Sequence, residues 1–180
     1  FNMQNFQYTQ DTIDAELKKS KEDFILHFRS AYTDDYPPAW MIAEILPLGL
    51  LCRIYTNLKD NVIKKRVAQH FGLQVPVFSS WIVILAGLRN MCCHHCRTWN
   101  RELATITTEP RRTKYGWIDS SRTDKRRMYY RICMIRYFLY TVSPNNSFKD
   151  KLKTLLAAYP NIDTAAMGFP SDWESEDIWK

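Results

Sequence analysis

The sequence has no runs of alternating polar and apolar residues of the kind that form β-strands, and it has neither internal repeats nor low-complexity tracts. It also lacks an uninterrupted apolar stretch of about 18 residues, the length that a membrane-spanning helix needs. No linker-like segment divides the 180 residues. These absences exclude a β-rich fold and a repeat array, and they favour one helical domain with no membrane partner.

The sequence also lacks the separated pairs of cysteine and histidine from which zinc sites are usually built. Three of its five cysteines, Cys92, Cys93 and Cys96, fall within one short stretch. Neighbouring cysteines on a helix are poor disulfide partners, so we expect reduced thiols and a cytoplasmic location. Because no second pair of Cys or His accompanies them, we expect no metal and no other cofactor.

What is present indicates a packed helical protein with a basic surface. Hydrophobic residues make up 46% of the chain and aromatic residues 14%, which favours a substantial core. The net charge of +6 and the pI of about 9.1 permit an RNA or DNA partner without proving one. The composition and periodicity together predict an all-α bundle of about five to seven helices.

Apolar periodicity predicts helices over residues 11–31, 39–58, 61–71, 81–103, 125–142 and a last one that ends at Ala158. Residues 1–10 are expected to form a loose arm, and 75–78 a turn. Pro47 should divide 39–58 into two shorter helices, and Gly72 should end 61–71. The expected N-caps are Ser79 or Ser80 for the central helix and Asn145 or Ser147 for the last. Trp173 and Trp179 should anchor the tail, 159–180, on the helices or on a partner.

The segment 105–124 is irregular and basic, and long irregular loops are often functional. Its candidate RNA-binding residues are Arg111, Arg112 and Lys114, interleaved with Tyr115 and Trp117. The cations suit a phosphate backbone, and the rings suit unpaired bases. A mobile surface loop explains the same residues. The run Lys64-Lys65-Arg66 is interpreted as a solvated helix face.

The central stretch carries Arg89, Asn90 and His94 in the pattern R-N-x-x-x-H. A histidine that titrates near neutral pH can transfer protons, and an arginine can stabilise charge on a phosphate. RNA supplies its own nucleophile in the 2′-hydroxyl, so this pattern permits cleavage without a metal. Three alternatives remain: a structural zinc site that uses Cys92 with Cys96, a cysteine–histidine nucleophile, and a buried polar cluster.

The same pattern lies in LRNMCCHHCRTWNRE, Leu88–Glu102, and resembles the R-x4-H motif of HEPN domains, an all-α and commonly ribonucleolytic family. The chain is more closely similar to Abi-like proteins of the AbiD/AbiF type, which act in abortive infection against phage. The segments that carry this resemblance are Leu88–Glu102, Pro37–Tyr55, Ala68–Leu73, Ser80-Trp81 and the closing 159–180. Such proteins usually have a longer N-terminal part, so we expect 1–180 to be a single HEPN-like domain from a longer protein. The family commonly has small residues at Cys93 and Cys96, which suggests that these thiols are packing groups.

The resemblance implies a metal-independent endoribonuclease that acts in phage defence or as a toxin. Arg89 would stabilise the scissile phosphate, His94 would be the general acid or base, and Asn90 would position them. The implied supporting residues are His95, Arg97, Trp99 and Asn100. The implied partners are an RNA substrate, a second copy in a homodimer, and an RNA or protein antitoxin. The alternative function is a non-catalytic RNA-binding or protein-interaction module on the same fold.

Overall fold

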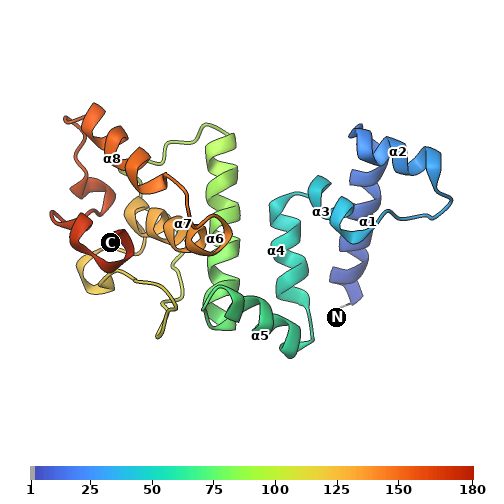
Figure 1. Cartoon of the computed structure of the whole chain (residues 1–180), viewed down its shortest axis with the longest axis horizontal. Coiled ribbons are helices and arrows are strands. Elements are labelled where there is room, and N and C mark those ends of the chain that lie inside the picture. Colours follow the sequence, from blue (N-terminus) through green and yellow to red (C-terminus); the bar gives the residue numbers. More distant parts are fainter. Residues whose placement is uncertain (1–2) are drawn as a thin grey trace. The chain divides into compact units, whose positions relative to one another are not determined.

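The computed structural model describes residues 3–180, and within them every regular element is helical. There are eight α-helices and four short 3-10 helices, which confirms the all-α class but gives more α-helices than the five to seven expected. The chain forms two compact units, residues 1–61 and 62–180 (Figure 1). Each unit is described separately below.

The first unit consists of α1 (Met3–Lys19), α2 (Asp23–Ala31), α3 (Ala39–Ile45) and α4 (Leu48–Asn57). Helix α1 contacts both α3 and α4. The buried apolar side chains of the first unit include Leu17, Ile25, Phe28, Leu46, Leu50 and Tyr55. The Tyr36 hydroxyl donates to Asp14 Oδ1 (2.8 Å) and ties the segment that precedes α3 back to α1.

The N-terminal helix differs from the prediction at both ends. Residues 3–10 are helical rather than a loose arm, and Phe1 and Asn2 lie outside the described residues. The helix predicted over 11–31 is interrupted between Lys19 and Asp23. Arg29 donates from Nη2 to the carbonyl oxygen of Leu17, which also accepts from the Ser20 N–H, so a side chain of α2 adds a second donor at the end of α1. The prediction missed the break because it depends on this contact between helices.

The division at Pro47 is confirmed. Helix α3 ends at Ile45, and Pro47 occupies the N-cap position of α4. Proline lacks an N–H and cannot continue a helix, but its fixed φ suits a helix start.

The second unit consists of α5 (Asn61–His70), α6 (Val75–Cys93), α7 (Met128–Val142) and α8 (Phe148–Ala158). Helices α6 and α7 pack against each other, and aromatic rings fill the space around Trp81. The Trp81 ring lies 4.7 Å from that of Trp117 and 5.5 Å from that of Tyr137, centroid to centroid. Gly72 follows α5 with φ +67°, as predicted for the residue that ends this helix.

Helix α6 begins six residues earlier than predicted, so the expected turn over 75–78 is wrong. Pro76 lies in the first turn, where its missing N–H costs nothing. The N-cap residue of α6 is Gln74, not Ser79 or Ser80 as expected. Ser80 Oγ instead accepts from the Thr108 N–H (3.1 Å). At α8, Ser147 occupies the N-cap position, but Asn146 Oδ1 accepts from the Phe148 N–H (3.0 Å).

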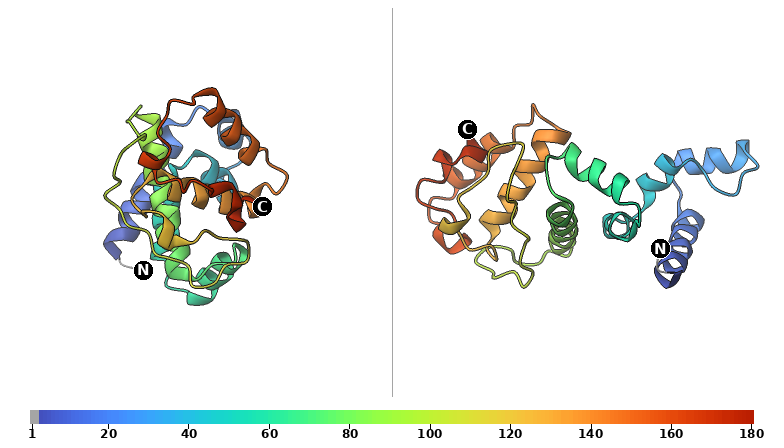
Figure 2. Two further views of the ribbon diagram at one scale, coloured as in Figure 1. Left: turned by 90° about the vertical axis from the view of Figure 1, so that its left-hand side faces the viewer. Right: turned by 90° about the horizontal axis from the view of Figure 1, so that it is seen from below.

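The segment that joins α6 to α7 runs along both helices and is fixed at several points (Figure 2). The Trp81 Nε1–H donates to the Thr108 carbonyl (3.0 Å), and the Leu103 N–H donates to the Arg126 carbonyl (2.9 Å). Its one regular element is the 3-10 helix η1 (Ser120–Arg122), which confirms an irregular segment. These bonds make it part of the packed unit rather than a loose loop.

The C-terminal tail is anchored by Trp179, as the sequence predicted. It contains the 3-10 helices η2 (Ala165–Met167), η3 (Trp173–Ser175) and η4 (Asp177–Trp179). Trp179 is fully buried, and its indole N–H donates to the Tyr129 hydroxyl (3.0 Å). That hydroxyl donates in turn to Glu176 Oε2 (3.3 Å). The Trp173 ring packs edge-on against Trp179.

By length and composition alone α6 could span a membrane, because an 18-residue window within it has a mean hydropathy of 1.4. This differs from the expectation based on uninterrupted apolar runs. A core helix of a soluble protein gives the same result, and six side chains of α6, Trp81 among them, are buried within the unit. The cytoplasmic location stays a prediction.

Burial of Glu176 leads to a prediction about pH and stability. Burial raises the pKa of the Glu176 carboxyl, although Arg122 Nη1 lies 3.8 Å away and lowers it in part. A raised folded-state pKa favours the folded form below the ordinary pKa, and this advantage is lost as the pH rises through the raised value. Glu176→Gln should therefore raise the melting temperature at neutral pH by roughly 2 °C.

The difference between Glu176→Gln and the unsubstituted chain should disappear at a pH below the ordinary carboxyl pKa. Thermal unfolding from acid to neutral pH measures it, with Glu44→Gln, at an exposed glutamate, as the control. A lower melting temperature for Glu176→Gln at neutral pH would contradict the interpretation.

Candidate functional site

Helix α6 ends at Cys93 in a backbone reversal, and not near Leu103 as predicted. His94 is the C-cap, and His95 adopts a left-handed conformation with φ +52°. The His95 N–H donates to the Cys92 carbonyl (3.1 Å) and the Cys96 N–H to the Met91 carbonyl (2.9 Å). This pair of bonds is the Schellman motif, which usually has glycine where His95 stands. The sequence gives no stop signal because neither glycine nor proline lies here.

The three candidate catalytic residues therefore lie at the exposed C-terminal end of α6. Arg89, Asn90 and His94 are all exposed. Arg89 Nη1 donates to Asn90 Oδ1 (3.3 Å), and the His94 N–H donates to the Asn90 carbonyl (3.0 Å). Counted at 100° per residue, the positions of Arg89 and His94 differ by roughly 140° around the helix axis, so their side chains leave the backbone on different sides. The hypothesis of a buried polar cluster does not fit these exposures.

The supporting residues follow the end of α6, although the helix predicted over 81–103 would have included them. His95 is in the reversal, and Asn100 is in a second left-handed turn with φ +44°. Arg127 Nη1 donates to Asn100 Oδ1 (3.3 Å), which ties this turn to the start of α7. Arg97 and Trp99 are exposed on the segment between the two turns.

The cysteines are free, and Cys92, Cys93 and Cys96 are exposed, so the expectation that Cys93 and Cys96 are packing groups is wrong. The zinc alternative required Cys92 and Cys96 to be one helical turn apart, but the helix ends between them. Within residues 3–180 no group of three or more His, Cys, Asp or Glu is arranged to hold a metal ion.

Residues 61–101, which include α5 and α6, carry charged side chains of one sign only. Residues 61–101 contain no Asp or Glu but six Lys and Arg. The first acid after this stretch, Glu102, is paired with Arg126 (2.5 Å). Such a stretch attracts polyanions and suits a nucleic-acid partner.

Two of the candidate RNA-binding residues meet a third cation in a groove of about 680 Å³. Arg112 and Lys114 line it together with Lys65 of α5, and no acidic residue is among its lining residues. We call it the basic groove. Arg111 is exposed beside Arg112. Lys65 was interpreted as part of a solvated face, and sequence alone gave no sign that it would meet the 105–124 segment.

Close contact between two backbones fixes the basic groove. A Cβ on Gly72 would lie 2.1 Å from Lys114 Cβ, so only glycine fits there. The Tyr137 hydroxyl accepts from the Lys114 N–H (3.1 Å) and donates to the Gly72 carbonyl (3.4 Å). Gln74 Nε2 also donates to the Arg112 carbonyl (3.1 Å). The cations therefore stand on a well-tied part of the unit.

The two aromatic candidates lie elsewhere. Trp117 packs on Trp81, and Tyr115 stacks on Tyr140 with ring centroids 5.1 Å apart. The Tyr115 hydroxyl accepts from Thr141 Oγ1 (3.2 Å). Both rings pack against other rings of the unit, so their stacking on RNA bases stays a prediction.

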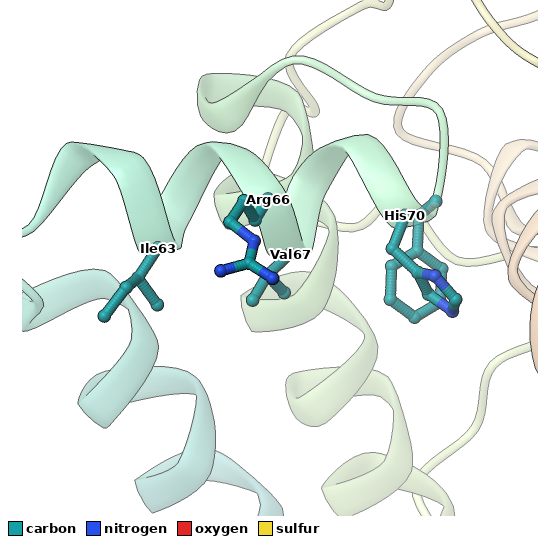
Figure 3. A pocket seen from close by; sticks show the side chains of 5 residues that line it. Ile63, Arg66, Val67 and His70 are labelled. Carbon is teal, nitrogen blue, oxygen red and sulfur yellow. The ribbon is translucent and has the colours of Figure 1, made fainter.

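A second arginine–histidine pair lies on α5. Arg66 and His70, four residues apart, line a hollow of about 370 Å³ with Ile63 and Val67, and the two side chains extend from the same face (Figure 3). The i, i+4 spacing places His70 beside Arg66 on one face of α5.

The fold and the site define a class of all-α protein with an arginine and a histidine exposed at a helix end and a cationic groove at the helix start. A family model of the Abi-like proteins matches residues 2–100, more than half of the chain. The chain therefore belongs to the Abi-like family, and this membership supports a function of the abortive-infection type.

The matched residues include the three candidate catalytic residues and the four supporting ones, and they end at Asn100. They include Pro37–Tyr55 but not the closing 159–180, so the match is shorter than the resemblance drawn from the sequence. No curated protein and no solved structure matches the chain.

The reversal at His95 gives a prediction about stability. A side chain in the left-handed region costs about 1 kcal/mol or more, so His95→Gly should unfold at higher urea concentration than His95→Ala. His95→Val should be the least stable of the three, because β-branched residues tolerate positive φ poorly.

His94 provides the matched control, because its φ of −91° favours no glycine. There the order should reverse, with His94→Ala at least as stable as His94→Gly. If glycine and alanine rank the same way at both positions, α6 does not end in this reversal.

Proposed function

We propose that this protein is a metal-independent endoribonuclease of the HEPN type, with Arg89, Asn90 and His94 as its catalytic residues, acting in abortive infection. The observation that carries the proposal is the exposure of these three side chains together at the end of α6. The matched Abi-like residues include all three.

The chemistry assigns each residue a task. The 2′-hydroxyl attacks the adjacent phosphorus, and the P–O5′ bond breaks, which gives a 2′,3′-cyclic phosphate and a 5′-hydroxyl. A neutral His94 takes the 2′-hydroxyl proton, or a protonated His94 gives one to the leaving oxygen. Arg89 stabilises the charge on the phosphate oxygens. Asn90, which accepts from Arg89, limits where the guanidinium can lie.

A second copy of the chain would bring an Arg89 and a His94 to the same phosphate, which one helix end cannot do. Arg89 and His94 point about 140° apart on α6, whereas acid–base and electrostatic catalysis require both groups at one phosphate. Two helix ends that face each other across a twofold axis bring Arg89 of one copy near His94 of the other. We therefore propose a homodimer as the active form.

The basic groove would hold the RNA backbone away from the cleavage site. Val75 lines this groove, and Asn90 lies fifteen residues along α6, about 23 Å at 1.5 Å per residue. At about 3.4 Å per nucleotide that distance corresponds to roughly seven nucleotides. An RNA strand with stacked bases that is shorter than this contacts only one of the two places at a time.

The alternative is a non-catalytic RNA-binding module, which the basic groove alone would favour. It predicts retention of RNA that weakens steeply with salt, and no cleavage. An RNA or protein antitoxin remains an expectation from the family resemblance.

Substitution at the helix end tests the proposed chemistry. Arg89→Ala and His94→Ala should each lower RNA cleavage by at least about a hundredfold with the melting temperature unchanged, because both side chains are exposed. Arg89→Lys should recover little, because lysine lacks the planar fork. Cleavage in excess chelator, assayed with end-group mapping, should equal that without chelator, and His27→Ala on α2 is the control.

Mixing the two inactive variants tests the dimer. If Arg89 and His94 act across copies, mixed dimers contain one complete pair, and activity should return to up to about a quarter. No recovery under conditions that exchange subunits would contradict the composite site. Equal activity of Arg89→Ala, His94→Ala and the unsubstituted chain would contradict the nuclease itself.

RNA length separates the basic groove from the cleavage site. Lys65→Ala, Arg112→Ala and Lys114→Ala should weaken binding of an RNA of about twelve nucleotides and lower its salt slope by about 0.7 per lost phosphate contact. Cleavage of a trinucleotide should not change. Lys151→Ala, at an exposed lysine on α8, is the charge-matched control. If Lys151→Ala has the same effect, the basic groove is not a specific contact.

A further inference from the structure

Arg131, in the first turn of α7, is buried and forms no ion pair, although the charge of Asp124 acts on it from a greater distance. Arg131 is 1% exposed. Its Nη2 donates to the Thr105 carbonyl, whereas Nε and Nη1 have no hydrogen-bond partner. None of the ion pairs found among residues 3–180 includes it. Burial lowers the pKa of the Arg131 guanidinium, but arginine stays charged at neutral pH. Two of the three nitrogens of this cation therefore lack an acceptor.

Arg131 lines a groove of about 310 Å³, which we call the Arg131 groove. One wall is the face of α6 that contains Gly87, and the other is the segment 101–105. The apolar lining residues are Val83, Ile84, Leu88, Met91, Leu103 and Ala104. Arg101 is the other cation of the lining, and no acid is among the lining residues. The volume is at the lower end of the range for small-molecule sites.

The charge and the walls together select the occupant. Arg131 is among the lining residues with two donors unsatisfied, and a phosphate oxygen is a strong acceptor for such donors. Both donor atoms are closed off from solvent, so the guanidinium has to turn towards the groove to bind one. The apolar walls require a flat or apolar body attached to that anion. A nucleotide unit has both parts, and base faces pack well on apolar side chains.

The position of the groove on α6 places it beside the proposed cleavage site. Counted at 100° per residue from Gly87, His94 lies about 20° and Asn90 about 60° to one side, whereas Arg89 lies about 160° away. In one chain the groove therefore continues towards Asn90 and His94, with Arg89 on the opposite side of the helix. This arrangement agrees with an Arg89 that acts on the other copy.

We propose that the Arg131 groove binds one nucleotide of the RNA substrate, with a phosphate oxygen accepting from Arg131 and the base or ribose against the apolar walls. The inference rests on the proposed function for the identity of the RNA. The same phosphate chemistry also suits a free mononucleotide, and the experiment separates the two sources.

Gly87 allows the groove to be filled without a clash. A Cβ at Gly87 meets nothing within 4 Å, and the same is true of Gly49 on α4. Gly87→Leu should therefore fill the groove and keep the fold, Gly49→Leu is the matched control, and Gly87→Ala adds only a methyl group. Both glycines lie within helices, so both leucine variants should melt at or above the temperature of the parent chain.

The binding assay uses the full chain with His94→Ala to prevent cleavage, and a labelled RNA of about twelve nucleotides. Gly87→Leu and Arg131→Met should each raise the Kd at least about tenfold, because the first fills the groove and the second removes the cation that binds the phosphate. Gly49→Leu should leave it within about twofold. Arg131→Met should melt at or above the temperature of the parent chain, because the cost of the unpaired buried charge is gone. A lower melting temperature would indicate that Arg131 has a structural role. In that case the Kd of Gly87→Leu alone decides whether the groove binds RNA.

A second arm adds adenosine monophosphate without RNA. If it raises the melting temperature of the parent chain but not of Gly87→Leu, and RNA binding is the same in both, the occupant is a free nucleotide and the RNA assignment is overturned. If Gly87→Leu binds and cleaves RNA as the parent does, the Arg131 groove inference fails while the nuclease stands. If no chain cleaves RNA but Gly87→Leu loses RNA binding, the nuclease fails while the groove stands.

Discussion

The backbone reversal at His95 is the constraint on which the candidate site depends. Two backbone hydrogen bonds close it, from His95 to Cys92 and from Cys96 to Met91, around a left-handed residue that is not glycine. If α6 continued as a helix, the residues after Cys93 would extend away from the unit. Because it stops, the chain returns along α6 and α7, and Leu103 bonds to Arg126. The exposed helix end and the Arg131 groove are both products of that return.

Sequence predicted those parts of the fold whose signals are local. Proline at 47 and glycine at 72 mark helix boundaries by their own backbone restrictions, and the tryptophan at 179 marks a buried anchor by its size. The end of α6 could not be predicted in this way, because a histidine takes a conformation that histidine rarely adopts. The split between α1 and α2 was missed for a different reason, since the contact from Arg29 to the Leu17 carbonyl is tertiary.

The same distinction applies to the site. The R-N-x-x-x-H pattern and the basic segment were found because each is contiguous in the sequence. The meeting of Lys65 with Arg112 and Lys114 was not, since it depends on the close approach of Gly72 to Lys114. Tyr115 and Trp117 are a different case: aromatic residues between cations suggest base stacking, but in the fold Trp117 packs on Trp81 and Tyr115 on Tyr137. Composition does not distinguish a ring that binds from one that packs.

Helix α6 combines a core role with a path for a polyanion. Its buried side chains, Trp81 among them, hold it against α7, so its ends are fixed relative to each other. The basic groove lies at its start, the Arg131 groove along its middle and Arg89 with His94 at its end. No acidic residue is among the lining residues of either groove, and residues 61–101 contain no Asp or Glu. Cations from neighbouring segments that lie at intervals along a rigid helix favour an extended, negatively charged ligand over a compact one, because only a chain can contact separated positive sites at once. Single-stranded RNA meets that requirement, and it also supplies the 2′-hydroxyl that the chemistry at His94 needs.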